Sequence, residues 1–247
     1  MNNAYQAADA AIKYLDFLNS TDGQIQQQIL SREILLRLPQ NPQAKILDAA
    51  CGSGWLSGQL RERYSGIEAC DSSALLIKFA RSHFPKIIFT ECGLELPLPY
   101  PKNNFDAVIL NMAAPDIENL NLACKNLSAI LKTNGSLILT IPNPDLTSPA
   151  AVWHRSPADV ILFKKPKLII KKPPAGGTKF KRDFGSSQIS SFYYTLENYL
   201  SAAAAAGFKP EQKVEIKSKQ DSKKFDLNYR LFRYPLFLLL KFIKVGQ

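Results

Sequence analysis

Two carboxylates and a pair of glycines are spaced so that they could hold a nucleoside. Asp48 lies in a short apolar run, and Gly52 and Gly54 follow it with one residue between them. Glycine permits a tight turn and lets a ligand approach backbone N–H groups closely. Asp71 ends the next apolar run, where a carboxylate can accept hydrogen bonds from both hydroxyls of a ribose. We therefore expect a ligand crevice at the carboxyl ends of two neighbouring strands.

The same residues favour a ligand that carries an ammonium group. The fingerprint of nicotinamide dinucleotide proteins has a third glycine, and Ser57 stands at that position. Asp48 precedes Gly52 by four residues, and its negative charge would repel a diphosphate. S-adenosylmethionine has an ammonium group, a ribose and an adenine, but no phosphate. An NAD-dependent reductase is accordingly disfavoured.

The hydrophobic pattern predicts the elements that must position these residues. Short apolar runs alternate with segments of helical spacing, which is typical of a parallel sheet with helices on both faces. Strands are expected at 45–50, 66–71, 86–90, 105–110, 136–141, 208–216 and 234–243. Helices are expected at 3–18, 24–38, 55–64, 73–84, 117–132 and 196–206, with a break at Asp22-Gly23 and a polar loop at 217–228. The predicted fold class is α/β, a doubly wound, mostly parallel seven-stranded sheet with an antiparallel C-terminal hairpin.

We expect residues 1–247 to form a single domain in four consecutive segments. Residues 1–43 would be N-terminal helices, and 44–142 would be the cofactor-binding core. Residues 143–192 interrupt the alternation with prolines and lysines, and they are interpreted as a basic insertion that forms a substrate lid. Residues 193–247 would supply a C-terminal helix and the closing hairpin.

The run from Leu47 to Gly54, together with Asp71, resembles the class I S-adenosylmethionine-dependent methyltransferases, in particular the group that acts on small molecules. The resemblance spans roughly 44–142 and returns at 192–244. It implies a Rossmann-like methyltransferase fold, S-adenosylmethionine as cofactor, and methyl transfer to an O, N or C nucleophile of a small-molecule substrate. The cofactor-binding positions that it implies are Asp48, Ala50, Gly52, Gly54, Trp55, Asp71, Ser72, Cys92, Gly93, Leu94, Asn111 and Met112.

The resemblance also divides the cofactor among these positions. The glycine turn would hold the methionine portion, and Asp71 would hold the ribose. Cys92 falls where relatives often have an acid that touches the adenine amino group, so the backbone of Gly93 or Leu94 would take that contact. The Asn111-Met112 pair would flank the transferred methyl.

A catalytic base is needed only where the acceptor must lose a proton, and the first candidates are His154 and Tyr194. His154 lies on the insertion, and imidazole titrates near physiological pH. Tyr193 and Asp116 are further candidates. The alternatives are a structural role for the histidine and a place in the pocket wall for the tyrosines. A non-catalytic member that keeps only the fold is also consistent with these residues.

The formal charge of +10 and the sequence pI near 9.4 point to an anionic partner. The basic segment Lys164–Arg182 concentrates this charge, and Phe163, Ile169 and Phe180 interleave with its lysines. It is either a solvated loop or a contact for an anionic substrate, nucleic acid or an anionic membrane surface. An RNA methyltransferase or nucleic-acid binder is therefore the main alternative function.

The remaining composition indicates an ordinary globular protein of the cytoplasm. Cys51, Cys70, Cys92 and Cys124 are widely spaced, which is typical of free thiols in a reducing compartment. Two histidines and no paired ligands predict no metal site. No secretory signal is visible at the N-terminus, and no apolar run approaches the ~20 residues of a transmembrane segment.

Overall fold

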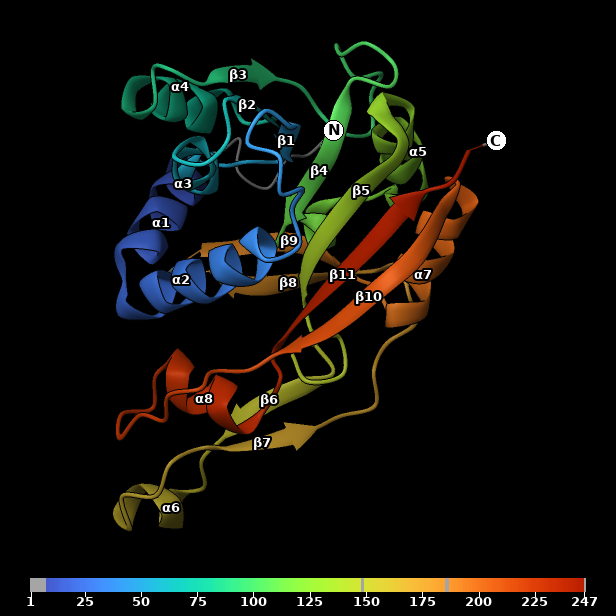
Figure 1. The fold of residues 1–247 in the computed structure, drawn as a ribbon. Helices are drawn as coiled ribbons and strands as arrows, with labels where there is room; N and C mark the ends of the chain where they lie inside the picture. Colours follow the sequence, from blue (N-terminus) through green and yellow to red (C-terminus); the bar gives the residue numbers. More distant parts are fainter. Residues whose placement is uncertain (1–7, 148, 185–186, 247) are drawn as a thin grey trace.

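The computed structural model describes residues 8–147, 149–184 and 187–246, without the side chains of 182–188. Its centre is a seven-stranded sheet in the order β10-β11-β5-β4-β1-β2-β3 (Figure 1). Its strands are β1 (Lys45–Ala49), β2 (Gly66–Asp71), β3 (Ile88–Glu91), β4 (Phe105–Asn111), β5 (Leu131–Pro142), β10 (Phe208–Ile216) and β11 (Phe237–Lys244).

Strand pairing confirms the predicted fold class. The β1 strand pairs in parallel with both β2 and β4, and the parallel pairing continues to β3 on one side and β5 on the other. The β11 strand is antiparallel to both β5 and β10, so a C-terminal hairpin closes this edge. The strand order reverses between β1 and β4, where the carboxyl ends of an open α/β sheet form a binding crevice.

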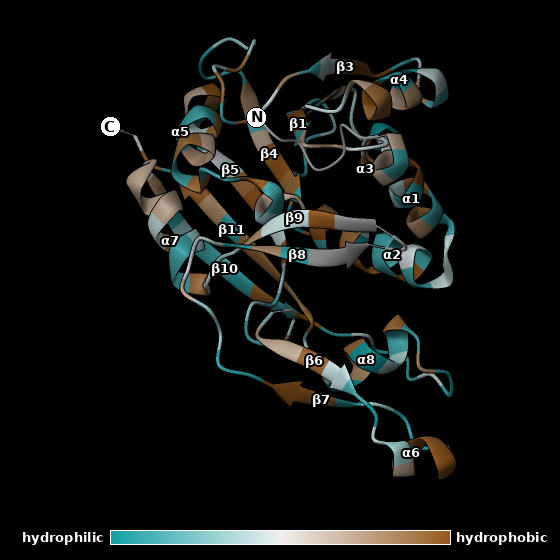
Figure 2. Ribbon diagram, turned by 180° about the vertical axis from the view of Figure 1, so that it is seen from behind, coloured by the Kyte–Doolittle hydropathy of each residue, from teal (hydrophilic) through white to brown (hydrophobic). Residues whose placement is uncertain are grey.

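The predicted insertion forms two antiparallel hairpins that leave the sheet at the carboxyl end of β5 (Figures 1 and 2). The first hairpin pairs β6 (Ala151–His154) with β7 (Lys167–Ile170), and the short helix α6 (Pro157–Ile161) lies between them. The second pairs β8 (Thr178–Phe184) with β9 (Ser187–Tyr193), and α1 contacts both of its strands. The two hairpins lie in different places on the body of the protein (Figure 1), so the predicted insertion consists of two separate parts.

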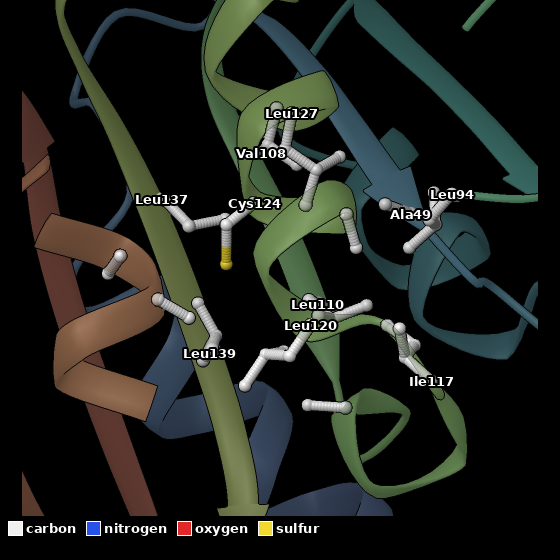
Figure 3. Close-up of a cluster of buried hydrophobic side chains, with 14 of the residues drawn as sticks. Ala49, Leu94, Val108, Leu110, Ile117, Leu120, Cys124, Leu127, Leu137 and Leu139 are labelled. Atoms are coloured by element: carbon white, nitrogen blue, oxygen red, sulfur yellow. The ribbon is translucent and has the colours of Figure 1, made fainter. Parts of the chain in front are cut away.

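Helices cover both faces of the sheet. Those described in the main body are α1 (Ala8–Asn19), α2 (Thr21–Leu35), α3 (Trp55–Arg61), α4 (Ala74–His83), the 3₁₀ turn η1 (Ala114–Asp116), α5 (Leu120–Ile130), α7 (Leu196–Ala205) and α8 (Leu227–Arg233). One core cluster joins α5 and α7 to alternate strand residues, and Figure 3 shows Leu120 and Leu127 of α5 in it beside Val108 and Leu139. The other cluster joins α2, α3, α4 and α8 to the intervening strand residues. No helix in the described ranges has the length and apolar character needed to cross a bilayer.

Several predicted boundaries are wrong, and two of the errors involve short-range capping. The second helix begins at Thr21, not at residue 24, because the Ser20 hydroxyl accepts the N–H of Gly23 and caps a first turn that contains Asp22-Gly23. The predicted loop at 217–228 runs into α8, which Asp226 caps by accepting the N–H of Tyr229. Only the buried residues Leu227 and Leu231 anchor this helix, a pattern too short to show periodicity.

Candidate cofactor and acceptor site

A tight turn joins β1 to α3 in left-handed backbone conformations. The φ angles are 54° at Ala50, 56° at Gly52 and 76° at Gly54. A Cβ atom at Gly54 would lie 2.8 Å from the ring of Phe89, and one at Gly52 would lie 2.7 Å from the hydroxyl oxygen of Tyr14. Glycine is therefore favoured at both positions by conformation, and at Gly54 also by the space that the buried ring of Phe89 leaves.

Asp71 fastens this turn to the end of β2. Its Oδ2 accepts the N–H of Gly52 at 2.8 Å, and its Oδ1 accepts the N–H of Ser73 at 2.8 Å. Burial raises the pKa of Asp71, and the N–H groups of Ser73 and Gly52 oppose that shift. Because the Gly52 N–H is donated to a carboxylate, it is not presented to a phosphate. The turn thus differs from a dinucleotide-binding turn in function as well as in sequence.

The end of β4 is a second constrained corner. Met112 has a φ of 58°, and its N–H is donated to the Thr140 carbonyl oxygen at 2.8 Å. The Thr140 hydroxyl in turn donates to the side-chain oxygen of Asn111. Beyond this corner, the η1 turn carries Asp116, whose Oδ1 accepts the Ser191 hydroxyl of β9 at 2.7 Å. A carboxylate from the sheet edge is thus held by a residue of the insertion.

These corners open into one cavity of about 880 Å³. The cavity also receives side chains from α1, α2, β8 and β9. The cofactor positions implied by the sequence that line it are Ala50, Gly52, Trp55, Asp71, Ser72, Cys92, Gly93, Leu94, Asn111 and Met112. The structure therefore brings together residues from the carboxyl ends of β1, β2, β3 and β4, as expected for neighbouring parallel strands.

Asp48 and Gly54 do not line the cavity. The two-residue period of β1 places the Asp48 side chain on the same face as Ile46, beneath α3, where its Oδ2 accepts the Ser57 hydroxyl at 2.6 Å. Burial raises the pKa of Asp48 to about 7, the Ser57 hydroxyl opposes the shift, and the charge of Asp71 adds to it. Asp48 supports the turn from behind, so a direct contact with the methionine portion is not part of this geometry.

An Asp48→Asn variant is expected to be more stable than the wild type at pH 8. A carboxyl with a raised folded-state pKa costs nothing below its ordinary value of 3.8, and the cost grows as pH rises to about 7. The full cost is of order 4 kcal/mol. Asparagine keeps the acceptor for Ser57 and carries no charge, so the variant should lose this pH dependence between pH 4 and 7.

Urea unfolding across that pH range measures the effect on the free energy of unfolding. A Ser57→Ala variant is the matched control, because loss of the hydroxyl raises the Asp48 pKa further and should extend the pH dependence above pH 7. Equal slopes for Asp48→Asn and wild type would contradict the assignment.

The structure does not bring His154 or Tyr194 to the cavity lining. His154 ends β6, with its side chain exposed, and pairs with Lys167 in the first hairpin. The Tyr194 hydroxyl is buried and donates toward the carbonyl oxygens of Ile117 and Glu118. Burial raises the pKa of Tyr194 to about 12, which disfavours proton exchange near neutral pH. Tyr193 does not line the cavity either, and among the predicted candidates only Asp116 does so.

Several lining residues lie outside the implied set, and the helices and the insertion supply many of them. These are Tyr14, Phe17, Leu18, Gln26, Leu76, Glu91, Glu95, Leu96, Ala113, Asp116, Ile117, Glu118, Pro142, Lys179, Ser190, Phe192 and Phe237. Tyr14 and Phe17 lie on one face of a predicted helix, and this spacing is a signal in the sequence that could have identified them as lining residues. The β8–β9 residues carry no such signal, because their position depends on a hairpin that pairs distant segments.

The four cysteines are free thiols, as predicted. Cys51, Cys70 and Cys124 are buried, and Cys92 is half-buried at the cavity. Burial raises the pKa of Cys124 to about 12, whereas a hydrogen bond with Cys70 lowers the pKa of Cys92. Across the described ranges, no group of three or more His, Cys, Asp or Glu side chains could hold a metal ion.

Residues 47–139, which hold the glycine turn, Asp71 and the corner after β4, match the model of the methyltransferase domain family. This stretch is therefore similar to a methyltransferase domain. A curated relative, the malonyl-[acyl-carrier protein] O-methyltransferase of Erwinia pyrifoliae, is 26% identical over 133 residues, which are 53% of this chain and 50% of that protein. The chain thus matches about half the length of this relative.

Solved methyltransferase structures share the whole fold. An S-adenosylmethionine-dependent methyltransferase from Mesorhizobium loti aligns with a TM-score of 0.69 at 21% identity, over 86% of this chain and 96% of that one. The glycopeptide N-methyltransferase MtfA, solved with S-adenosyl-L-homocysteine, aligns with a TM-score of 0.61 at 10% identity, over 87% and 88%. Both neighbours point to S-adenosylmethionine as the cofactor to compare with the cavity.

The residues of the methyltransferase domain fit that cofactor. Asp71 offers carboxylate oxygens to a ribose diol, and Leu76 and Leu94 offer apolar surface to an adenine. The Ser53 hydroxyl, in the glycine turn, is buried and has no hydrogen-bond partner among the described residues. Ser53 does not line the cavity, so its hydroxyl is not counted among the groups that would contact the cofactor.

Proposed function

We propose that the protein transfers a methyl group from S-adenosylmethionine to a small-molecule acceptor. The observation that carries the proposal is the single cavity that joins the Asp71-fastened glycine turn to the Asp116 carboxylate. A volume of about 880 Å³ lies toward the upper end for small-molecule sites, which leaves room for an acceptor beside a cofactor.

The chain's own residues then have distinct tasks. When bound, S-adenosylmethionine would supply a methyl group: a lone pair of the acceptor bonds to the methyl carbon, and the positively charged sulfur leaves with the electron pair of the broken S–CH3 bond. Asp71 holds the ribose, and the Asn111-Met112 corner fixes the floor of the cavity near the reacting atoms. Asp116 accepts the proton that an O–H, N–H or acidic C–H acceptor must lose, and Ser191 orients its carboxylate. Positioning by these fixed groups supplies the remainder of the rate enhancement.

The charges of the cavity support a neutral or cationic acceptor in preference to an anionic one. The charged side chains among its described lining residues are Asp71, Glu91, Glu95, Asp116, Glu118 and Lys179. A nucleic-acid acceptor would bring its negative phosphates close to these acidic side chains, which would repel it. The exposed lysines at 164–172 are outside the lining, so an anionic partner that they bind would be distinct from the acceptor.

Isothermal titration of the purified protein with S-adenosylmethionine, and separately with NAD, tests the cofactor. Binding of S-adenosylmethionine alone is expected, and binding of NAD alone would overturn the proposal. Incubation with a methyl-labelled cofactor and a metabolite extract, followed by mass spectrometry, identifies the acceptor as the species that gains the label. Label transfer to RNA in place of small molecules would establish the nucleic-acid alternative.

A further inference from the structure

The first hairpin of the insertion projects from the body and ends in an exposed apolar tip (Figure 2). We define the tip as Val160–Phe163, at the end of α6 and the residues that follow. Its four side chains are 51%, 75%, 60% and 90% exposed in chain order. Four consecutive large apolar residues at this exposure form a contiguous patch, which monomeric soluble proteins rarely present without a partner.

The backbone holds the tip in this outward position. A capping box between Ser156 and Asp159 fixes the start of α6. Phe163 has a φ of 51°, which is unfavourable for a bulky side chain, and its N–H is donated to Val160 at 3.1 Å. The Lys164 N–H returns to the Asp159 carbonyl at 2.8 Å. A hydrogen-bonded turn thus keeps the most exposed phenylalanine away from the protein.

The base of the hairpin is packed, so the projection is not a loose loop. The Trp153 ring contacts Phe225 and Tyr234, with ring centroids 5.1 Å and 5.7 Å apart. The Lys165 ammonium lies 3.8 Å from the centroid of the Tyr229 ring and donates to the Ser222 carbonyl at 3.2 Å. These contacts hold the first hairpin against the body. We call the segment from β6 to β7, with its tip, the arm.

Cations flank the tip. We define the basic collar as the exposed residues Arg155, Lys164 and Lys167, which lie at the tip end of the first hairpin. The acid beside the tip, Asp159, is already hydrogen bonded to Ser156. An apolar end flanked by lysines matches a bilayer interface, where acyl chains accept the apolar residues and anionic headgroups accept the cations.

We propose that the tip and the basic collar dock the protein on an anionic membrane surface. A nucleic acid fits less well, because three of the four tip residues are aliphatic and cannot stack on bases. A second copy of the chain fits less well, because the collars of two copies repel each other. The proposal rests on this arm alone and does not depend on methyl transfer. The Arg182 side chain, at the end of the predicted basic segment, lies outside the described residues.

Co-sedimentation of the full chain with lipid vesicles tests the proposal. We expect binding to vesicles of phosphatidylcholine mixed with phosphatidylserine, weaker binding at high salt, and little binding to phosphatidylcholine alone. Phe163→Ser should lower the partition coefficient roughly tenfold, as expected for a phenylalanine that leaves an apolar phase. Lys164→Gln with Lys167→Gln should lower it roughly twenty-five-fold, at about fivefold for each lysine.

Matched control variants distinguish vesicle binding through the arm from non-specific adsorption to vesicles. Leu36→Ser removes another exposed apolar residue, 62% exposed at the end of α2, and should leave partition unchanged. Lys209→Gln with Lys213→Gln removes the same charge from the edge strand β10, where both are exposed, and should have a much smaller effect. The proposal is overturned by equal losses in arm and control variants, or by no binding to anionic vesicles. It is also overturned if the arm variants change only polynucleotide retention or only self-association.

Discussion

Asp71→Ala is expected to weaken S-adenosylmethionine binding roughly a hundredfold, because hydrogen bonds to a charged group contribute about 1.5–3 kcal/mol. The carboxylate is placed to accept the ribose hydroxyls, and it also accepts the N–H groups of Gly52 and Ser73. Removing it both takes away the ribose acceptor and releases the glycine turn. Isothermal titration calorimetry measures the loss of affinity.

Asp71→Asn is the companion variant, because it keeps the shape and one acceptor oxygen while the charge is lost. Its loss of affinity should be smaller than that of the alanine variant. Thermal unfolding of both variants separates a lost contact from a lost fold. Full affinity in a folded Asp71→Ala protein would remove the ribose assignment.

The sequence predicted the strands and the convergence of the residues that follow them, because both depend on local features. Strands covered on both faces read as apolar runs, as in Phe105–Asn111. The carboxyl end of each parallel strand lies at one edge, so residues that follow the runs, such as Asp71 and Cys92, converge without any knowledge of long-range contacts.

The orientation of Asp48 was not predicted correctly from its motif. An acid just before a glycine turn can face the ligand or the layer beneath the helix, and the motif is the same in both cases. The alternation along β1 decides the question: Leu47 and Ala49 belong to the α5 side of the core, and Ile46 belongs to the α3 side with Asp48. The pairing of Asp48 with Ser57 was the available signal, at a separation that reaches from the strand into the first turns of α3.

The acceptor end could not be predicted in the same way. Asp116 was one of several candidate bases, and nothing nearby in the sequence distinguished it from His154. The distinction comes from Ser191, which lies 75 positions away and reaches Asp116 only because β8 and β9 pair over the cavity. Hairpin pairing at such separation depends on tertiary packing against α1, which hydrophobic periodicity does not encode.

Asp116→Asn is expected to lower kcat roughly 10²- to 10⁴-fold, the usual contribution of a positioned general base. The amide keeps the shape and the hydrogen bond from Ser191, but it cannot accept a proton. The dissociation constant of S-adenosylmethionine should stay unchanged, because Asp116 lies in η1 and not among the residues proposed to hold the cofactor. Turnover of the acceptor found with the methyl-labelled cofactor is the measurement, and Glu62→Gln, an exposed carboxylate outside the cavity lining, is the control.

Variants of Ser191 test whether Asp116 acts as an oriented base or only contributes negative charge to the cavity. Ser191→Ala should lower kcat about tenfold to a hundredfold, the equivalent of one hydrogen bond to a charged group, and Ser191→Thr should restore most of it. A purely structural role would move the unfolding temperature and spare kcat in the folded variants. If Asp116→Asn turns over the acceptor at the wild-type rate, then the acceptor reaches the cavity already deprotonated, and the chain's contribution is reduced to holding cofactor and acceptor in line.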